Sequence, residues 1–428
     1  MGHIVNSDRE YRMLQTRLDR HITGAPASET FMKILKLLFT PEDARLARQI
    51  PTKPISLNGL ARKLDVPREE LDDRMTDLAE RGLVIDIMYN NKRYFSLAPV
   101  VIGFFEFTFM RTRDELPMAE LARLFDRYMT EDDRFARSVF QGQTQLGRSL
   151  VREEALIDQD HTEILDWERA SHIIQSATQA AVSLCACRHK ASHLGTACDK
   201  PQEVCLSLNF SADVLIRSGL ARSVTIDEAM RILEVAKDAG LAQTGDNVQR
   251  TVGYICNCCG CCCGMMEAVK LFNMKHAIVT SNWLMEIDPV KCKGCGQCAA
   301  ACPLDIIEIV SEGTGRHKKA WAVRDETLCL GCGVCYTACK FDAIRMKPRA
   351  HRVFTPETTF DRLVAMAIER GKLADLLFED PRKLSHRALG RIIGVLEKTA
   401  PYRAVMAVKP LRSAFFNALV GGVGGMLK

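Results

Sequence analysis

The chain contains 428 residues, of which 47% are hydrophobic and 26% are charged, and its formal net charge is +5. This composition is typical of a soluble globular protein, and the length predicts about three domains. The charge is too small to indicate nucleic-acid binding by itself, and no apolar run approaches the roughly 20 residues of a membrane span.

The start of the chain and its 18 cysteines together indicate the cellular compartment of the protein. Residues 1–20 are rich in charge and contain no apolar signal core, so we expect an unsecreted, cytoplasmic protein. Many cysteines in such a protein indicate metal-bound thiolates rather than disulfides.

The N-terminal part predicts helices followed by a hairpin. Residues 1–28 are expected to form a polar helix and a linker. Apolar residues at helical spacing predict a helix over 29–39, and Ser56 can cap a second helix. A third helix follows, and Asn90-Asn91 then predicts the turn of a β-hairpin. This order of elements resembles a winged helix-turn-helix.

The winged-helix-like domain, which we assign to residues 29–99, carries the wrong charge for DNA on its third helix. That helix, 68–81, has six acidic and three basic residues, and the acidic ones are Glu69, Glu70, Asp72, Asp73, Asp77 and Glu80. They would repel phosphate, whose attraction supplies most non-specific affinity for DNA. We therefore expect no nucleic-acid partner, and a protein-docking or structural use of the domain.

A helical domain is expected over residues 100–181. Its aromatic run is expected to fill a core, and it comprises Phe104, Phe105, Phe107 and Phe109. His161 and His172 are interpreted as ordinary helix residues rather than ligands.

Ten cysteines lie in two stretches of residues 182–282, which we interpret as a metal-binding or cluster-binding domain. The first stretch has the spacing C-x-C-x10-C-x6-C and comprises Cys185, Cys187, Cys198 and Cys205. Four cysteines at this separation can surround an iron–sulfur cluster, and a zinc site is the alternative.

Residues between these cysteines bear on the same site. Cys185 and Cys187 would present their thiols on one face of an extended strand. Arg188 and Lys190 would offset thiolate charge. His189 or His193 could replace one thiolate.

The second stretch has six cysteines in eight positions, namely Cys256, Cys258, Cys259, Cys261, Cys262 and Cys263. Six thiolates cannot all bind one cubane, which takes four. We expect the helical segment 211–245 to fold this stretch against the first, so that the two share one or two clusters. A redox-active thiol array without metal is the alternative.

The run C-x2-C-x2-C-x3-C occurs twice in residues 283–350, with a separation of 37 residues. This spacing is typical of iron–sulfur ligands, because three closely spaced thiolates can wrap one corner of a cubane. Glycines between the cysteines allow the tight turns that this requires. The two runs comprise Cys292, Cys295, Cys298 and Cys302, and then Cys329, Cys332, Cys335 and Cys339.

This repeat resembles a bacterial-type 2[4Fe-4S] ferredoxin domain. In such domains the fourth cysteine of each run serves the other cluster. The resemblance therefore implies one cluster on Cys292, Cys295, Cys298 and Cys339, and a second on Cys329, Cys332, Cys335 and Cys302. Two departures are Lys340, which replaces the usual proline, and the polar insertion 311–320. Lys291, Lys293 and Arg345 are expected to raise the cluster potentials somewhat.

Residues 351–428 predict a C-terminal helical region with helices over 360–370 and 386–396. The segment 413–427 is uncharged and contains several large apolar residues. We expect no transmembrane span, but this tail could dock on a partner or a membrane surface.

The fold class expected is α+β, a mostly helical multidomain chain. Its ordered cysteine sets resemble large multi-cluster 4Fe-4S dicluster ferredoxin-like proteins, which implies intracellular electron transfer. We expect a subunit or partner of a larger oxidoreductase that exchanges electrons with redox proteins, because no flavin or nucleotide motif is present. The alternatives are a redox-sensing winged-helix regulator and an enzyme with a catalytic cluster at 256–263.

Overall fold

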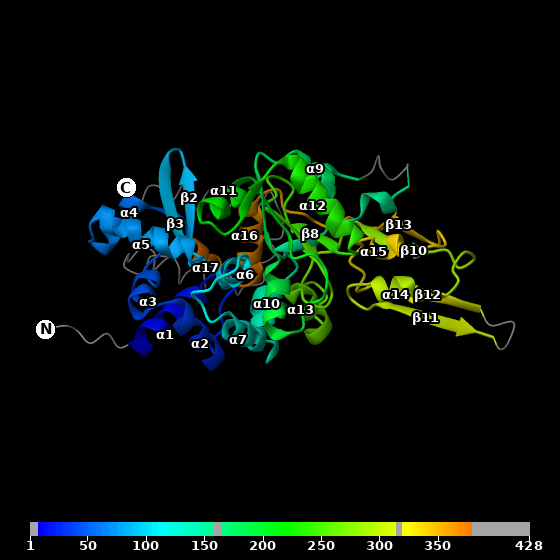
Figure 1. Cartoon of the computed structure of the whole chain (residues 1–428), viewed down its shortest axis with the longest axis horizontal. Coiled ribbons are helices and arrows are strands. Elements are labelled where there is room, and N and C mark those ends of the chain that lie inside the picture. The colour runs from blue at the N-terminus through cyan, green and yellow to red at the C-terminus, as the bar shows by residue number, and fades with distance from the viewer. Residues whose placement is uncertain (1–6, 158–163, 314–318, 379–428) are drawn as a thin grey trace, which may run out of the picture.

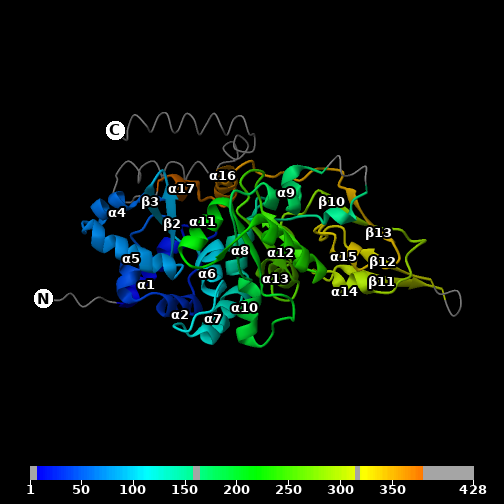
Figure 2. The same cartoon turned by 45° about the horizontal axis from the view of Figure 1, so that its top comes forward.

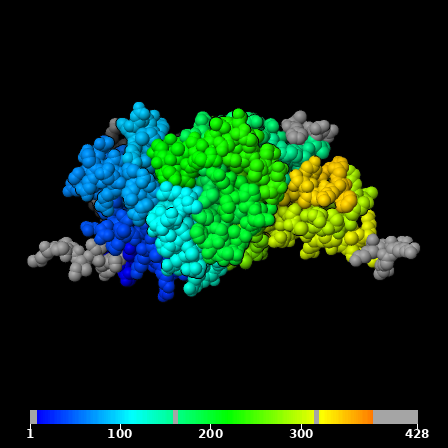
Figure 3. Space-filling model, viewed as in Figure 1, coloured from blue at the N-terminus to red at the C-terminus, as the bar shows by residue number. Residues whose placement is uncertain are grey.

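Three regions follow one another along the chain and along the long axis of the molecule (Figures 1 and 2). The computed structural model describes residues 7–157, 164–313 and 319–378. Helices and a small sheet occupy one end, and a six-stranded sheet lies in the middle (Figure 1). The cysteine-rich unit projects at the other end, where Figure 3 shows it in yellow and orange. Among the described residues, no helix combines the length and the apolar character needed to cross a membrane.

The N-terminal region places its helices and hairpin where the sequence predicted them. Ser56 caps α4 by accepting a hydrogen bond from the amide of Gly59, and Asn90 and Asn91 turn the hairpin with positive φ angles of 47° and 56°. The elements are α1 (Ser7–Leu18), α2 (Glu29–Leu38), α3 (Pro41–Ala47), β1 (Ile55–Ser56), α4 (Leu57–Leu64), α5 (Arg68–Glu80), β2 (Val84–Tyr89) and β3 (Lys92–Leu97). The strand order is β1-β3-β2. Membership of the winged-helix fold stays a prediction.

Helix α1 was expected to be a polar helix before a linker, but one of its faces is part of the core. Tyr11, Leu14 and Leu18 are buried, and they share a core with the following helices. That core also contains Phe104, Phe105, Phe107 and Phe109, so the predicted core role of this aromatic run is confirmed. The elements that carry and cover these phenylalanines are η1 (Val100–Phe104), α6 (Phe105–Phe109), α7 (Met118–Thr130) and α8 (Arg134–Phe140).

An antiparallel sheet of order β4-β8-β9-β6-β5-β7 forms the centre of the molecule. Its strands are β4 (Gly147–Ser149), β5 (Ala180–Leu184), β6 (Glu203–Leu208), β7 (Arg222–Val224), β8 (Ala242–Asp246) and β9 (Tyr254–Cys258). The associated helices are η2 (Glu153–Ala155), η4 (Asp166–Glu168), α9 (Ala170–Gln175), α10 (Ala186–Leu194), α11 (Asn209–Arg217), α12 (Ile226–Asp238) and α13 (Gly264–Phe272).

This sheet corrects the expectation that residues 100–181 and 211–245 are helical throughout, because β4, β5, β7 and β8 lie within or overlap those ranges. The strands are short, and every residue of β8 and nearly every residue of β5 is buried. A strand buried on both faces has no alternation of polar and apolar residues, so its period-2 pattern is missing from the sequence.

The C-terminal unit contains two copies of the same backbone arrangement. Strand β10 (Trp283–Ile287) pairs with β13 (Ile344–Pro348), and β11 (Ile307–Glu312) pairs with β12 (Lys319–Arg324). Short helices α14 (Gln297–Ala301) and α15 (Val334–Thr337) follow the glycines of each run. Equivalent residues share positive φ angles, 61° and 69° at Gly294 and Gly331, and 58° and 48° at Asp305 and Asp342. The predicted internal repeat is therefore present in the backbone, and the described residues of the insertion at 311–320 include the end of β11 and the start of β12.

After this unit the chain returns toward the N-terminal region. Helix α16 (Thr359–Glu369) confirms the helix expected over 360–370, and α17 (Leu373–Leu377) follows. Buried Arg362 forms an ion pair with Asp246 at the end of β8, and Lys372 donates to the carbonyl oxygens of Asp19 and His21. The predicted helix 386–396 and the apolar tail 413–427 lie outside the described residues.

Candidate metal centres

Two cavities lie in the C-terminal unit, and four cysteines line each of them. The outer cavity is lined by Cys292, Cys295, Cys298 and Cys339. The inner cavity is lined by Cys302, Cys329, Cys332 and Cys335. Each set combines three cysteines of one run with the last cysteine of the other, which is the interleaved arrangement expected from the sequence. Ligation of a cluster by these sets stays a prediction.

The two cavities fit cubane clusters. Their other lining residues are mainly apolar, such as Ile307 and Met346 at the inner cavity and Ile309 and Ile344 at the outer one. Within the described chain, no three cysteines of either set have sulfurs that all lie within 4.8 Å of one another. A cubane needs such separation, because four irons and four sulfides lie between its thiolates.

The inner cavity is the more buried of the two. Cys329, Cys332 and Cys335 are buried, whereas Cys295 at the outer cavity is exposed. The surroundings also differ in charge, because arginines lie behind the inner cavity and lysines lie around the outer one.

Arg152 approaches the inner cavity from the segment after β4. It is buried, its amide donates to the carbonyl of Cys332 at 3.1 Å, and its guanidinium donates to Thr337 Oγ1 at 2.8 Å. Burial lowers the pKa of Arg152, and the neighbouring thiols of Cys332 and Cys335 oppose that shift. Because Arg152 is far from the cysteines in sequence and follows no motif, sequence reasoning missed it.

Arg349 is the second cation at the inner cavity. Its guanidinium donates to the carbonyl oxygens of Cys329 at 2.6 Å and Ser281 at 3.0 Å. Arg349 belongs to a basic stretch with Lys347 and Arg352, but nothing in the sequence marks its contact with a cysteine run.

Around the outer cavity the expected lysine charge is partly neutralised. Lys291 forms an ion pair with Asp342 at 2.7 Å, and both side chains are accessible to solvent. Lys293 and Arg345 are exposed. The amide of Ala322 donates to Cys292 Sγ at 3.4 Å, so the β12 backbone supplies one hydrogen bond to sulfur.

The ten upstream cysteines converge at one end of the central sheet and form two groups. Strands β5 and β9 end there, β6 begins there, and helices α10 and α13 start with Cys185 and Cys263 as their N-caps. Cys185 and Cys187 do not lie on one face of a strand, so the expectation that they would is wrong. Cys185 follows β5 and Cys187 lies in the first turn of α10.

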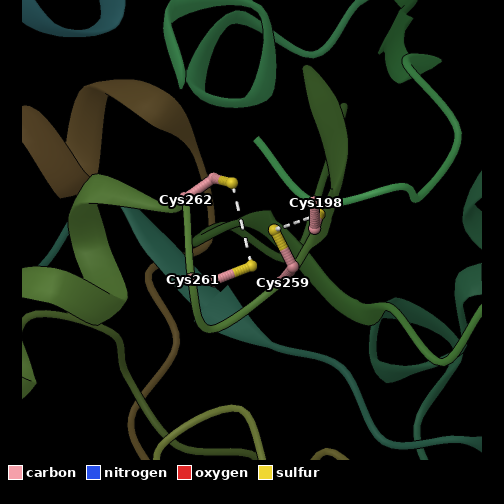
Figure 4. Close-up of side chains that lie close together, drawn as sticks. All are labelled: Cys198, Cys259, Cys261 and Cys262. Atoms are coloured by element: carbon pink, nitrogen blue, oxygen red, sulfur yellow. Dashed lines mark hydrogen bonds between the residues drawn. The ribbon is translucent and has the colours of Figure 1, made fainter. Parts of the chain in front are cut away.

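The first group, called here the four-thiol site, comprises Cys198, Cys259, Cys261 and Cys262 (Figure 4). Its sulfurs all lie within 4.8 Å of one another. Sulfur–sulfur distances are 3.7 Å for Cys198–Cys259 and 3.7 Å for Cys261–Cys262. Hydrogen bonding from Cys262, and secondarily from Arg188, lowers the pKa of Cys259 to about 4, although burial opposes the shift.

The second group, called here the six-thiol group, comprises Cys185, Cys187, Cys205, Cys256, Cys258 and Cys263. Cys205 lies opposite Cys256 across β6 and β9, because Leu206 pairs with Ile255. Cys258 interacts with both Cys256 and Cys263. These contacts lower the pKa of Cys258 to about 6. A hydrogen bond with Cys263, followed by burial, raises the pKa of Cys187.

Arg188 lies between the two groups with its side chain fully buried. Its Nη1 is 3.6 Å from Cys259 Sγ, and its Nη2 donates to the carbonyl of Asn257 at 3.3 Å. Burial alone would lower the pKa of Arg188, but the thiols of Cys185 and Cys259 raise it. The expected offset of thiolate charge is thus available from Arg188, whereas Lys190 pairs with Asp126 at 2.7 Å.

The histidines considered as ligands have other partners. His189 Nδ1 is 2.8 Å from the carbonyl oxygen of Phe109, and its Nε2 is 3.2 Å from His193 Nε2. His172 lies in α9 with a side chain that is 42% exposed. His161 lies outside the described residues.

The loop 259–263 packs directly against the C-terminal unit. A Cβ added at Gly260 would collide with the backbone of Pro303, the residue after Cys302 of the inner cavity. Cys258 and Cys263 share an apolar cluster with Leu304, Leu330 and Cys332. The upstream cysteines and the inner cavity are therefore neighbours.

Residues 291–343 match the family described as 4Fe-4S dicluster domain. No curated protein and no solved structure matches the chain. The C-terminal unit is therefore a ferredoxin-like dicluster domain, and the chain is an iron–sulfur, metal-binding protein of mixed α+β fold. The resemblance of the whole chain to multi-cluster proteins stays a prediction.

Proposed function

We propose that this chain conducts electrons between a redox protein bound at the outer cavity and a centre held by the six-thiol group. The observation that carries the proposal is the contact between Gly260 and Pro303, because it joins the loop of the upstream cysteines to the ligand run of the inner cavity. The order of sites is then outer cavity, inner cavity and six-thiol group, because Cys258 and Cys263 share an apolar cluster with Cys332 of the inner cavity.

The dicluster domain supplies the first two positions. A cubane bound in each cavity would supply reversible exchange of single electrons. The cysteines hold it, Ile307 and Met346 exclude water from the inner site, and Arg152 and Arg349 provide positive charge that favours a more negative, reduced state.

The six-thiol group supplies the third position. Its thiols come from β6, β9, α10 and the turns before α10 and α13, and Cys258 and Cys263 are buried. Thiols that are packed together without metal would repel as thiolates or oxidise to disulfides. Their convergence therefore supports a bound iron–sulfur cluster, with more thiols present than the four that one cubane uses.

The surface beside the outer cavity supports a protein partner. Val290 is 78% exposed and Phe341 is 43% exposed, and their sequence neighbours Lys291 and Asp342 form an ion pair. Lys293 and Lys340 are also exposed there. An apolar patch with a cationic rim fits a redox protein whose docking face is acidic.

The charge on α5 supports electron transfer over gene regulation. Glu69, Glu70 and Asp73 are exposed on this helix. Of its basic neighbours, Arg81 is already bound to Asp43 and Asp77. An exposed acidic helix opposes docking on phosphate.

A reductive titration followed by paramagnetic resonance spectroscopy tests the proposal. Full-length protein purified without oxygen is expected to take up more than the roughly two electrons that two cubanes accept. The Cys258→Ser variant is expected to lose the additional uptake and to keep that of the dicluster domain. Uptake that ends at about two electrons in the unaltered chain would contradict the proposal.

A further inference from the structure

The four-thiol site differs from every other cysteine group in the described chain, because its sulfurs are close enough to share one ion. We propose that Cys198, Cys259, Cys261 and Cys262 hold a single divalent metal ion in tetrahedral coordination rather than a cluster. This inference does not rest on the proposed electron transfer, since the site is defined by its own geometry.

The sulfur separations carry the argument. A zinc–thiolate bond is about 2.3 Å long, so the edge of a tetrahedron of four such thiolates is about 3.8 Å. The Cys198–Cys259 and Cys261–Cys262 pairs are each separated by 3.7 Å, and all four sulfurs lie within 4.8 Å of one another (Figure 4). The site is therefore sized for one ion.

The dicluster domain provides an internal comparison. Its two cysteine sets surround cavities, and among the described residues no three of their sulfurs approach within 4.8 Å of one another. A cubane in the four-thiol site would require all four sulfurs to move apart. Cys259 and Cys262 are buried, so that movement would disturb the surrounding core.

The local chain also suits a mononuclear site. Cys259 and Cys262 are separated by two residues, a spacing common in structural zinc sites, and Cys198 comes from the turn before β6. Four thiolates around a divalent ion leave a net charge of about −2. Fully buried Arg188, whose Nη1 lies 3.6 Å from Cys259 Sγ, offsets part of that charge.

Zinc and ferrous iron share the tetrathiolate chemistry that this site offers. Either ion would tie the turn at Cys198 to the loop at 259–262. Since Gly260 of that loop packs on Pro303, the ion would fix the contact between the central sheet and the dicluster domain.

The test compares metal and acid-labile sulfide in full-length protein purified without oxygen. The variants Cys198→Ser and Cys261→Ser are each expected to lose one metal ion per chain and no sulfide. Elemental mass spectrometry then identifies the lost ion as zinc or iron. Cys256→Ser, in the six-thiol group, is the matched control: any loss there takes iron and sulfide in equal amounts, so its metal still exceeds its sulfide by one per chain.

Two results in the variants would overturn the inference. Loss of about four irons together with about four sulfides in Cys198→Ser would show a cubane, and unchanged metal in both variants would show that no ion is bound. If the variants do not fold, the ratio of metal to sulfide in the unaltered chain still tests the inference, because cubanes contain equal amounts of iron and sulfide. The inference requires that total metal exceed sulfide by one per chain, and equal amounts would contradict it.

Discussion

In the dicluster domain eight cysteines surround two cavities, whereas the ten upstream cysteines form two groups, and among the described residues only the four-thiol site brings its sulfurs within 4.8 Å of one another. The first arrangement is built from two short runs and the glycines between their cysteines. The second is assembled from strand ends, helix starts and a loop that lie far apart in sequence. Open cavities suit cubanes and the compact four-thiol site suits one ion, so the two regions are expected to perform different tasks.

The largest expected effect comes from removing single ligands in the dicluster domain. Cys302→Ser and Cys332→Ser are expected to abolish the same cluster, because both residues line the inner cavity. Each should remove about four irons and four sulfides per chain. Cys339→Ser is the matched control and should remove the outer cluster instead. Resonance spectra of the reduced variants distinguish the two clusters, and a shared effect of Cys302→Ser and Cys298→Ser would refute the interleaving.

Removal of one upstream thiol tests whether the six-thiol group holds a cluster. Cys258→Ser is expected to remove a cluster from the six-thiol group while the iron and sulfide of the dicluster domain remain, because Cys258 contacts both Cys256 and Cys263. Iron and sulfide analysis with resonance spectroscopy measures this. Unchanged iron and sulfide would leave the six thiols as a metal-free array.

A glycine substitution tests the connection between the two regions. Gly260→Ala is expected to slow electron transfer from the dicluster domain to the six-thiol centre severalfold, because the added methyl group would push the loop away from Pro303. Gly264→Ala is the control, since a Cβ there meets no atom within 4 Å. Rapid-mixing spectroscopy measures both rates, and equal rates in the two variants would argue against this route.

The smallest expected effects are changes of reduction potential. Arg152→Met should lower the potential of the inner cluster, because it removes a buried positive charge that favours the reduced state. Lys293→Met should lower that of the outer cluster less, because solvent screens an exposed charge. Arg152→Lys retains the charge and controls for packing. Redox titration measures the shifts, and a larger shift from Lys293→Met would reverse the expected asymmetry.

The dicluster domain could be predicted from the sequence because all its ligands lie in two runs with a diagnostic spacing. The grouping of the upstream cysteines could not. Cys205 and Cys256 become neighbours only through the pairing of β6 with β9, in which Leu206 lies opposite Ile255. Because β5 and β8 are short and buried on both faces, the sequence did not reveal the sheet that brings them together.

Arg152 and Arg188 show, for single residues, which contacts can be predicted from the sequence and which cannot. Arg188 is adjacent to a cysteine in sequence, so its role beside thiols was foreseeable. Arg152 reaches Cys332 and Thr337 from a distant segment, and no local pattern marks it. Long-range contacts of this kind depend on the packing of the central sheet against the dicluster domain.

Iron and acid-labile sulfide, counted per chain in anaerobically purified full-length protein, test the central claim most directly. Two clusters in the dicluster domain and one in the six-thiol group predict at least about twelve irons and twelve sulfides. A yield of about eight of each from protein with a fully occupied dicluster domain would contradict the account. It would reduce the chain to a ferredoxin-like domain fused to a protein without further clusters.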